Sequence, residues 1–201
     1  MPDRPPPVVA VVLAAGHSRR MGTPNKLLLP VRGEAMVRHA VHAARAAGCA
    51  EVIVVLGHEA AAVRAALDGL VVRCVVNDAH ADGLGSSVRC GDAAAAPDAA
   101  LLCLLGDMPD VQAGTLRALI TALAETPGTQ ACRPVHGGQP GNPVLWAPAQ
   151  RPRLATLQGD EGARALLKTL GGGLLHVPVD DPGVLLDLDT PQDLRRHGDA
   201  A

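Results

Sequence analysis

The sequence predicts an α/β fold built on a Rossmann-like, doubly wound and mostly parallel sheet. Short apolar runs rich in Val, Leu and Ile recur along the chain, and segments of helical length rich in Ala and Arg separate them. The apolar runs are nearly continuous rather than alternating, which is typical of parallel strands that helices cover on both faces. Regular alternation of the two kinds of segment indicates βαβ units. In a chain of 201 residues without a long linker, we expect one domain over 1–201.

The first half of the chain provides the predicted parallel strands and their connecting helices. The helix over 35–48 shows its pattern most clearly, because its apolar residues share one stripe and Gly48 is a stop signal. The stripe consists of Met36, Val37, Ala40, Val41 and Ala44. The predicted strands are 8–14, 51–57, 71–77 and 100–107, and two further helices cover 58–69 and 115–125.

The pattern changes after Thr126, where Gly and Pro become frequent. We expect a small irregular β insertion there, with strand-like pieces at 130–134 and 143–146. A helix with Asp160 as its N-cap should follow. At the end of the chain, Thr190 and Asp193 have the spacing of a capping box, with Pro191 at the first helical position.

Composition excludes several classes of function. The chain has one Trp, no Tyr and no Phe, and its formal net charge is −2, so neither base stacking nor a broad basic surface supports nucleic-acid binding. Five cysteines without a CxxC pair argue against a disulfide framework or a zinc site and suit a reducing cytoplasm. No segment approaches the ~20 apolar residues that span a bilayer, so we expect a cytoplasmic protein without membrane contact.

The loop after the first predicted strand combines glycines with basic side chains. Gly16 and Gly22 allow main-chain N–H groups to turn inward, and Arg19, Arg20 and Lys26 add positive charge, which suits a polyphosphate. The spacing matches neither a P-loop nor G-x-G-x-x-G. From this loop alone, a phosphate cradle and an ordinary strand-to-helix turn are equally open.

The residues of this loop resemble the L-A-A-G-x-S-x-R-M-G-x-x-N-K-L-L signature of MobA-like nucleotidyltransferases, and the cytidylyltransferase branch most of all. The resemblance implies an NTP and Mg²⁺ as ligands, with transfer of the NMP to a phosphorylated acceptor and release of pyrophosphate. It implies catalytic roles for Arg20 and Lys26. It assigns nucleotide binding to Leu13, Ala14, Ala15, Gly16, Ser18 and Gly22.

Asp107 emerges directly after a buried predicted strand, at the edge where such sheets bind ligands. A carboxylate there can bind Mg²⁺ through oxygen, and the sequence G-D-M-P matches the metal-binding element of the same family. The alternative is a loop acid that caps the next helix, a role that Asp110 fits better than Asp107.

The segment from Asn77 to Ser87 follows the third predicted strand. Gly83 and Gly85 permit close backbone approach, and Ser86 sits at a predicted helix start as a candidate N-cap. The resemblance assigns this region to the base and ribose. It gives nucleotide-binding roles to Asn77, Gly83, Gly85, Ser86 and Ser87.

Two further elements complete the expected site. Along an extended strand Asp187 and Asp189 would point to one face, where a carboxylate pair suits a hard cation; Asp189 is the preferred metal ligand and the choice between them stays open. In the family, an element like Gly141-Asn142-Pro143 borders the acceptor pocket. The lone Trp146 is expected in the core, and the eight histidines show no metal-binding pattern.

The resemblance therefore implies transfer of CMP from CTP to the terminal phosphate of molybdopterin or the molybdenum cofactor. Ala14-Ala15 favours CTP over GTP by analogy only. A sugar phosphate or another phosphorylated acceptor is the alternative substrate. A non-catalytic protein that delivers the cofactor to a molybdoenzyme or its chaperone is the alternative of another class, and a dehydrogenase is disfavoured by the missing G-x-G-x-x-G.

Overall fold

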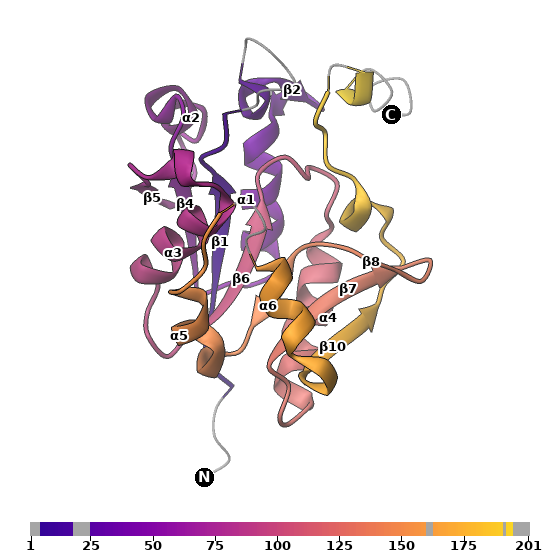
Figure 1. The fold of residues 1–201 in the computed structure, drawn as a ribbon. Helices are drawn as coiled ribbons and strands as arrows, with labels where there is room; N and C mark the ends of the chain where they lie inside the picture. Colours follow the sequence, from indigo (N-terminus) through magenta and orange to yellow (C-terminus); the bar gives the residue numbers. More distant parts are fainter. Residues whose placement is uncertain (1–4, 18–24, 160–162, 191, 195–201) are drawn as a thin grey trace.

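A computed structural model describes residues 5–17, 25–159, 163–190 and 192–194. It contains a mostly parallel central sheet between two layers of helices (Figure 1), which confirms the predicted fold class. The strand order is β10-β7-β9-β6-β1-β4-β5, and β8 pairs with β7 at the side. The strands are β1 (Val8–Ala14), β4 (Glu51–Leu56), β5 (Arg73–Val76), β6 (Ala100–Leu105), β7 (Ala131–His136), β8 (Gln139–Pro140), β9 (Val144–Trp146) and β10 (Leu174–Pro178). A separate antiparallel pair consists of β2 (Pro30–Val31) and β3 (Glu34–Ala35).

Strand β1 lies at the centre of the sheet and runs parallel to β4 on one side and to β6 on the other. Val11 is in register with Ile53 of β4 and Cys103 of β6. All of its residues are buried, since alternate side chains enter the two hydrophobic cores on opposite faces of the sheet. Burial on both faces is why the sequence of this strand is continuously apolar.

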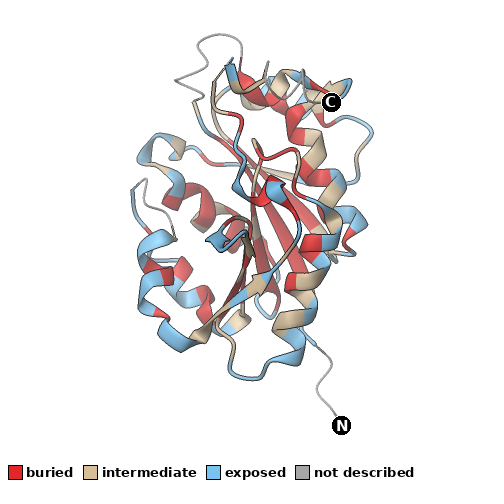
Figure 2. Cartoon of the chain, turned by 90° about the vertical axis from the view of Figure 1, so that its right-hand side faces the viewer, coloured by how far each residue is buried: buried red, intermediate tan, exposed pale blue. Residues whose placement is uncertain are grey.

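Helices cover both faces of the sheet. Side chains of α1, α2 and α4 contribute to one core, and those of α3, α5 and α6 to the other. Figure 2 shows buried residues along the strands and the inner sides of the helices. The predicted stripe of α1 is buried at all five positions, and Gly48 follows the helix at φ +84°. The helices are α1 (Met36–Ala46), α2 (Ala60–Ala66), α3 (Leu84–Ala94), α4 (Ala113–Glu125), α5 (Arg151–Leu154) and α6 (Arg164–Thr169). None of the described helices is long and apolar enough to cross a membrane.

The Gly- and Pro-rich stretch after Thr126 joins the main sheet. Strand β9 lies between β6 and β7 and is antiparallel to both, and β7 forms a hairpin with β8. Trp146 of β9 is fully buried, as expected. The segment with Asp187 and Asp189 is not a strand: the 3-10 helix η5 (Pro182–Leu185) precedes it.

Two predicted helix caps are wrong. Helix α3 begins at Leu84 with Gly83 as its N-cap, so Ser86 lies inside the helix. The Ser86 hydroxyl donates a hydrogen bond to the Gly83 carbonyl. The φ of Gly83, +94°, is a backbone conformation that favours glycine. Helix α4 begins after Gln112, and Asp110 instead forms an ion pair with Arg32.

The capping box near the end of the chain is present: the Thr190 amide donates to Asp193 (2.8 Å) and the Asp193 amide donates to the Thr190 hydroxyl (3.2 Å). Asp160 and Pro191 lie outside the described residues.

Candidate active site

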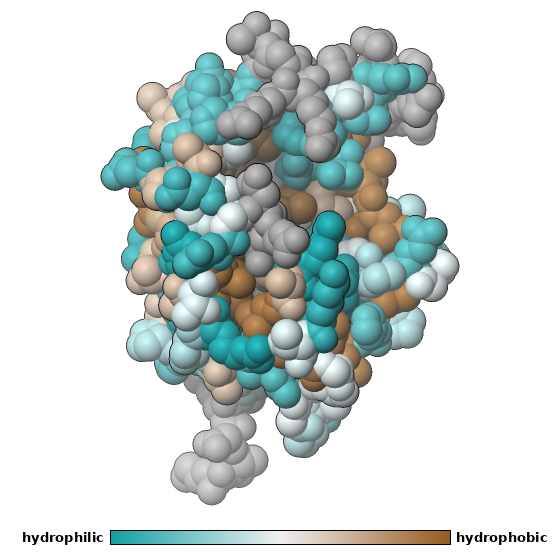
Figure 3. Space-filling model, in the orientation of Figure 1, coloured by the Kyte–Doolittle hydropathy of each residue, from teal (hydrophilic) through white to brown (hydrophobic). Residues whose placement is uncertain are grey.

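A cavity of about 560 Å³ opens at the carboxyl ends of β1 and β6. The chain leaves β1 toward β4 on one side, while β6 flanks β1 on the other, so the cavity lies at the point where the strand order reverses. Open α/β sheets bind their ligands at such a point. In the space-filling view, brown hydrophobic residues are visible near the middle of the face shown, with teal hydrophilic residues around them (Figure 3). The lining includes Leu13, Ala15, Gly16, His17, Lys26, Leu27, His80, Ala81, Gly83, Leu84, Ser87, Leu105, Asp107, Asp187 and Asp189.

Lys26 lies between the two acids predicted to hold a metal. Its Nζ is 2.5 Å from Oδ2 of Asp107 and 2.5 Å from Oδ1 of Asp189. Burial alone would lower the pKa of Lys26, but Asp107 and Asp189 outweigh it and raise the pKa above its usual 10.5. The lysine is therefore charged at neutral pH, with its ammonium group in contact with both carboxylates.

Local structure fixes each member of this cluster. The Asn25 side chain accepts a hydrogen bond from the Leu27 backbone amide (3.1 Å) and so caps the 3-10 helix η1 (Lys26–Leu28). Lys26 is the first residue of this helix. Asp107 follows the end of β6 by two residues. The Leu188 amide donates to the Asp107 carbonyl (3.0 Å), and the buried Leu188 side chain packs beside Val31 and Met36.

The acids fit a hard divalent cation. Oδ1 of Asp107 is buried and has no hydrogen-bond partner among the described residues. Buried carboxylate oxygens require a donor or a cation, so this atom points to a ligand that the protein itself does not supply. No group of three or more His, Cys, Asp or Glu within the described ranges is arranged around a metal. Two carboxylates are nevertheless sufficient when waters and substrate phosphates supply the other ligands, as is usual for Mg²⁺.

The loop after β5 and the start of α3 form another wall of the cavity. The side-chain amide of Asn77 donates hydrogen bonds to the hydroxyls of Ser86 (2.8 Å) and Ser87 (3.1 Å), and both serines are buried. Ser87 and the nearby Gly83 line the cavity, whereas Asn77 and Ser86 do not. Asn77 and Ser86 therefore hold the start of the helix in place. Gly85 lies against the backbone of Gln158, which leaves little space for a side chain.

A profile described as the MobA-like NTP transferase domain matches residues 10–176. The chain belongs to this family.

Among its relatives, the nicotine blue oxidoreductase of Paenarthrobacter nicotinovorans is 34% identical over 198 residues and covers 95% of this chain and 96% of its own length. The purine catabolism protein PucB of Bacillus subtilis is 33% identical over 204 residues, covering 94% of this chain and 95% of its own. A structure of Rv0371C from Mycobacterium tuberculosis H37Rv, described as a complex with manganese, has a TM-score of 0.83 at 32% identity and covers 97% of this chain and 100% of that one.

The remaining predicted residues of this MobA-like transferase fall into three groups. Leu13, Ala15 and Gly16 line the cavity, while Ala14 is buried beside it. Ser18, Arg20 and Gly22 lie outside the described residues. The acceptor element does not line the cavity.

That element, Gly141-Asn142-Pro143, instead packs against η5. The Asn142 amide donates to the Val184 carbonyl (2.9 Å), and a Cβ at Gly141 would collide with the same carbonyl. The element therefore contacts the segment that leads to Asp187 and Asp189 rather than the cavity itself.

The structure also brings together three histidines that the sequence did not single out as a group. The His17 ring lies 4.9 Å from that of His58 and 4.6 Å from that of His80, measured between ring centroids. The three residues follow β1, β4 and β5, whose carboxyl ends share one edge of the sheet. Gly57 makes this approach possible, because a Cβ there would lie 2.7 Å from the Cβ atoms of Ala15 and His80. Their positions at three strand ends are the only signal in the sequence, and they carry no recognisable spacing.

Proposed function

We propose that this MobA-like nucleotidyltransferase moves CMP from CTP to the terminal phosphate of molybdopterin or the molybdenum cofactor and releases pyrophosphate. The observation that carries the proposal is that Lys26, Asp107 and Asp189 converge in one cavity. Two glycines, Gly16 and Gly83, also line this cavity, and the lack of a side chain there lets a ligand approach the backbone. The family supports nucleotidyl transfer, and the signature around Ala14-Ala15 supports the choice of CTP.

The proposed reaction is an in-line attack of the acceptor phosphate on the α-phosphorus of the nucleotide. A phosphate monoester has a second pKa of about 6 and is largely dianionic at neutral pH, so the reaction needs no strong general base. The protein has to bring two anions together and to stabilise the charge that develops on the departing pyrophosphate. We assign the binding of β- and γ-phosphates to Gly16, Lys26 and the predicted Arg20.

Asp107 and Asp189 would hold Mg²⁺ or Mn²⁺, which supplies charge neutralisation on the phosphate oxygens when bound. The unpartnered Oδ1 of Asp107 and the hard oxygen donors support this assignment. The manganese complex of Rv0371C is a family precedent for a divalent cation. We place the acceptor phosphate in the cavity near Asp187 and Asp189, whose segment follows the helix η5 that the Gly141-Asn142-Pro143 turn contacts. The proposed recipient of the product is a molybdoenzyme or its chaperone.

The test is pyrophosphate release by the purified protein with a panel of NTPs and acceptors. We expect CTP with purified molybdenum cofactor to be the best pair, and Asp107→Ala to abolish the release because the site loses a carboxylate that holds the cation. Near-normal turnover of Asp107→Ala at ordinary Mg²⁺ would contradict the assigned role.

The same panel separates the alternatives. Product formation with a sugar phosphate, but not with the pterin cofactor, would identify the other acceptor class. Tight binding of molybdenum cofactor without pyrophosphate release from any NTP would indicate a delivery protein.

A further inference from the structure

The buried acid Asp181 lies outside the cavity lining and connects the parts of the chain next to the two proposed metal ligands. Asp181 is 2% exposed. Its Oδ2 accepts hydrogen bonds from the Gln112 amide (2.9 Å) and the Thr115 hydroxyl (2.6 Å), and its Oδ1 accepts one from the Gly183 amide (3.0 Å). These three hydrogen bonds compensate for the free-energy cost of burying the carboxylate.

These donors belong to two different parts of the chain. Gln112 and Thr115 begin helix α4, directly after the loop that contains Asp107. Gly183 lies in η5, directly before the extended segment that contains Asp189. At Gly183 the two parts touch, because a Cβ there would collide with the Asp110 backbone. Asp181 therefore joins the start of α4, which follows the Asp107 loop, to the start of η5, which precedes the segment with Asp189.

A second connection lies next to the acids themselves, where the Leu188 amide donates to the Asp107 carbonyl (3.0 Å). Both connections reach the second segment before Asp189, one of them at Asp181 and the other at Leu188. Movement of the stretch from Asp181 to Leu188 relative to the loop after β6 and the start of α4 requires these hydrogen bonds to break.

We propose that Asp181 is a positioning residue that fixes the placement of Asp189 relative to Asp107 and so sets the affinity of the site for a divalent cation. The inference rests on the proposed metal-binding role of these two acids. Metal affinity depends on groups behind the ligands that hold them in place, and loss of such a group typically weakens binding by about 10- to 100-fold.

Mn²⁺ binding to the full-length protein, followed by the electron paramagnetic resonance signal of free Mn²⁺ without nucleotide, tests this directly. In Asp181→Asn the new NH₂ group cannot accept one of the three hydrogen bonds, and we expect about tenfold weaker binding. Thr115→Val should weaken binding in the same direction. Thr115→Ser keeps the hydroxyl and should keep the affinity of the unmodified chain.

Two controls separate positioning from general destabilisation. Asp180→Asn changes the neighbouring acid, whose side chain is fully exposed, and should leave Mn²⁺ binding unchanged. Asp92→Asn removes a buried carboxylate that binds Arg151 (2.6 Å) from α5, on the sheet face opposite α4. This variant should lower the melting temperature without weakening Mn²⁺ binding.

Unchanged Mn²⁺ affinity in folded Asp181→Asn and in Thr115→Val would overturn the inference. An equal loss in Asp92→Asn would overturn it as well, because the effect would then come from stability alone. Failure of the unmodified chain to bind Mn²⁺ would contradict the metal-binding role of Asp107 and Asp189, which distinguishes failure of the proposed function from failure of the positioning role.

Discussion

At the scale of single residues, the contact of Lys26 with both acids decides how the site behaves without substrate. The ammonium group balances one of the two carboxylate charges, and Lys26 as a whole is buried, at 9% exposure. A divalent cation held by Asp107 and Asp189 would compete with this ammonium group for the same two carboxylates. A displaced Lys26 would then be available for a phosphate, which is the role proposed for it.

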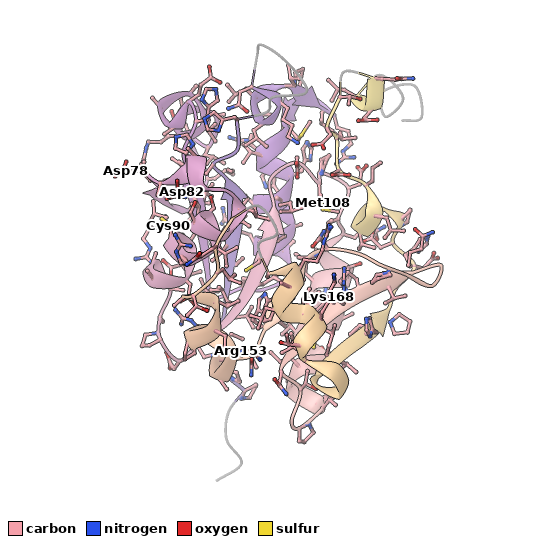
Figure 4. All side chains as sticks on the ribbon, in the orientation of Figure 1. Asp78, Asp82, Cys90, Met108, Arg153 and Lys168 are labelled. Atoms are coloured by element: carbon pink, nitrogen blue, oxygen red, sulfur yellow. The ribbon has the colours of Figure 1, made fainter. Side chains whose placement is uncertain are left out.

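The variant Lys26→Met tests this competition. Without the ammonium group, Mn²⁺ should bind severalfold more tightly in the absence of nucleotide, whereas nucleotidyl transfer should slow by about 100- to 1000-fold because phosphate stabilisation is lost. Free Mn²⁺ measured by electron paramagnetic resonance and pyrophosphate release give the two quantities. The control Lys168→Met removes an exposed lysine of α6, labelled in Figure 4, and should change neither. Weaker Mn²⁺ binding by Lys26→Met would contradict the competition.

Residue roles could be predicted only where a motif carried them. Lys26 belongs to a long sequence signature and Asp107 to the short element G-D-M-P, and the structure places both together with Asp189. The histidines at the ends of β1, β4 and β5 could not be found in this way, because their proximity depends on three loops that meet in space and on the absence of a side chain at Gly57. Asp181 was missed for the same reason, since all its donors except Gly183 are distant in the sequence.

At the scale of elements, the close approach of α3 to the sheet depends on Gly91. A Cβ at this position would collide with Val11 of β1 and lie 3.1 Å from Val55 of β4. The two valines are fully buried and cannot move aside without disturbing their own packing.

Gly91→Ala should therefore destabilise the protein by about 1–3 kcal/mol, as expected for overpacking in a core. Gly114→Ala is the matched control, because Gly114 also lies in a helix but has no atom within 4 Å of the added Cβ. The control should be neutral or more stable by up to about 1 kcal/mol, since Ala has the higher helix propensity. Urea unfolding curves measure both; equal stabilities of the two variants would refute the packing argument.

Element type was predictable wherever burial on two faces or on one helical stripe determined the sequence pattern. The parallel strands and the stripe of α1 are examples. The direction of β9 was not predictable, because the apolar pattern of a buried three-residue strand is the same whether the strand is parallel or antiparallel to its neighbours. The start of α3 was also missed, since Gly83 takes the N-cap position through a backbone conformation that a serine pattern does not reveal.

At the scale of the whole molecule, the cysteines are buried or partly buried against the two hydrophobic cores. All five are free thiols. Burial raises the pKa of Cys49 and of Cys132 to about 11. Burial and the nearby charge of Asp78 also raise the pKa of Cys90, a residue of α3 that is labelled in Figure 4. Thiolate is the reactive form, so few of these groups are reactive at neutral pH.

A disulfide reagent at pH 7.5 should consequently label the folded protein slowly, and all five thiols should react quickly in guanidinium chloride. The raised pKa values of the thiols also make the stability of the fold depend on pH. Between pH 9 and 11 the unfolded chain loses thiol protons that the folded protein keeps, so these groups make stability fall as the pH rises. Rapid labelling of Cys132 in the folded protein would contradict its burial.

Asp189, the last residue of the cluster, lies outside the central sheet. The strand β10 ends at Pro178, and Asp189 follows only after η5. A truncated fragment that stops after Pro178 would therefore contain every strand of the described sheet but would lack one of the two carboxylates that contact Lys26.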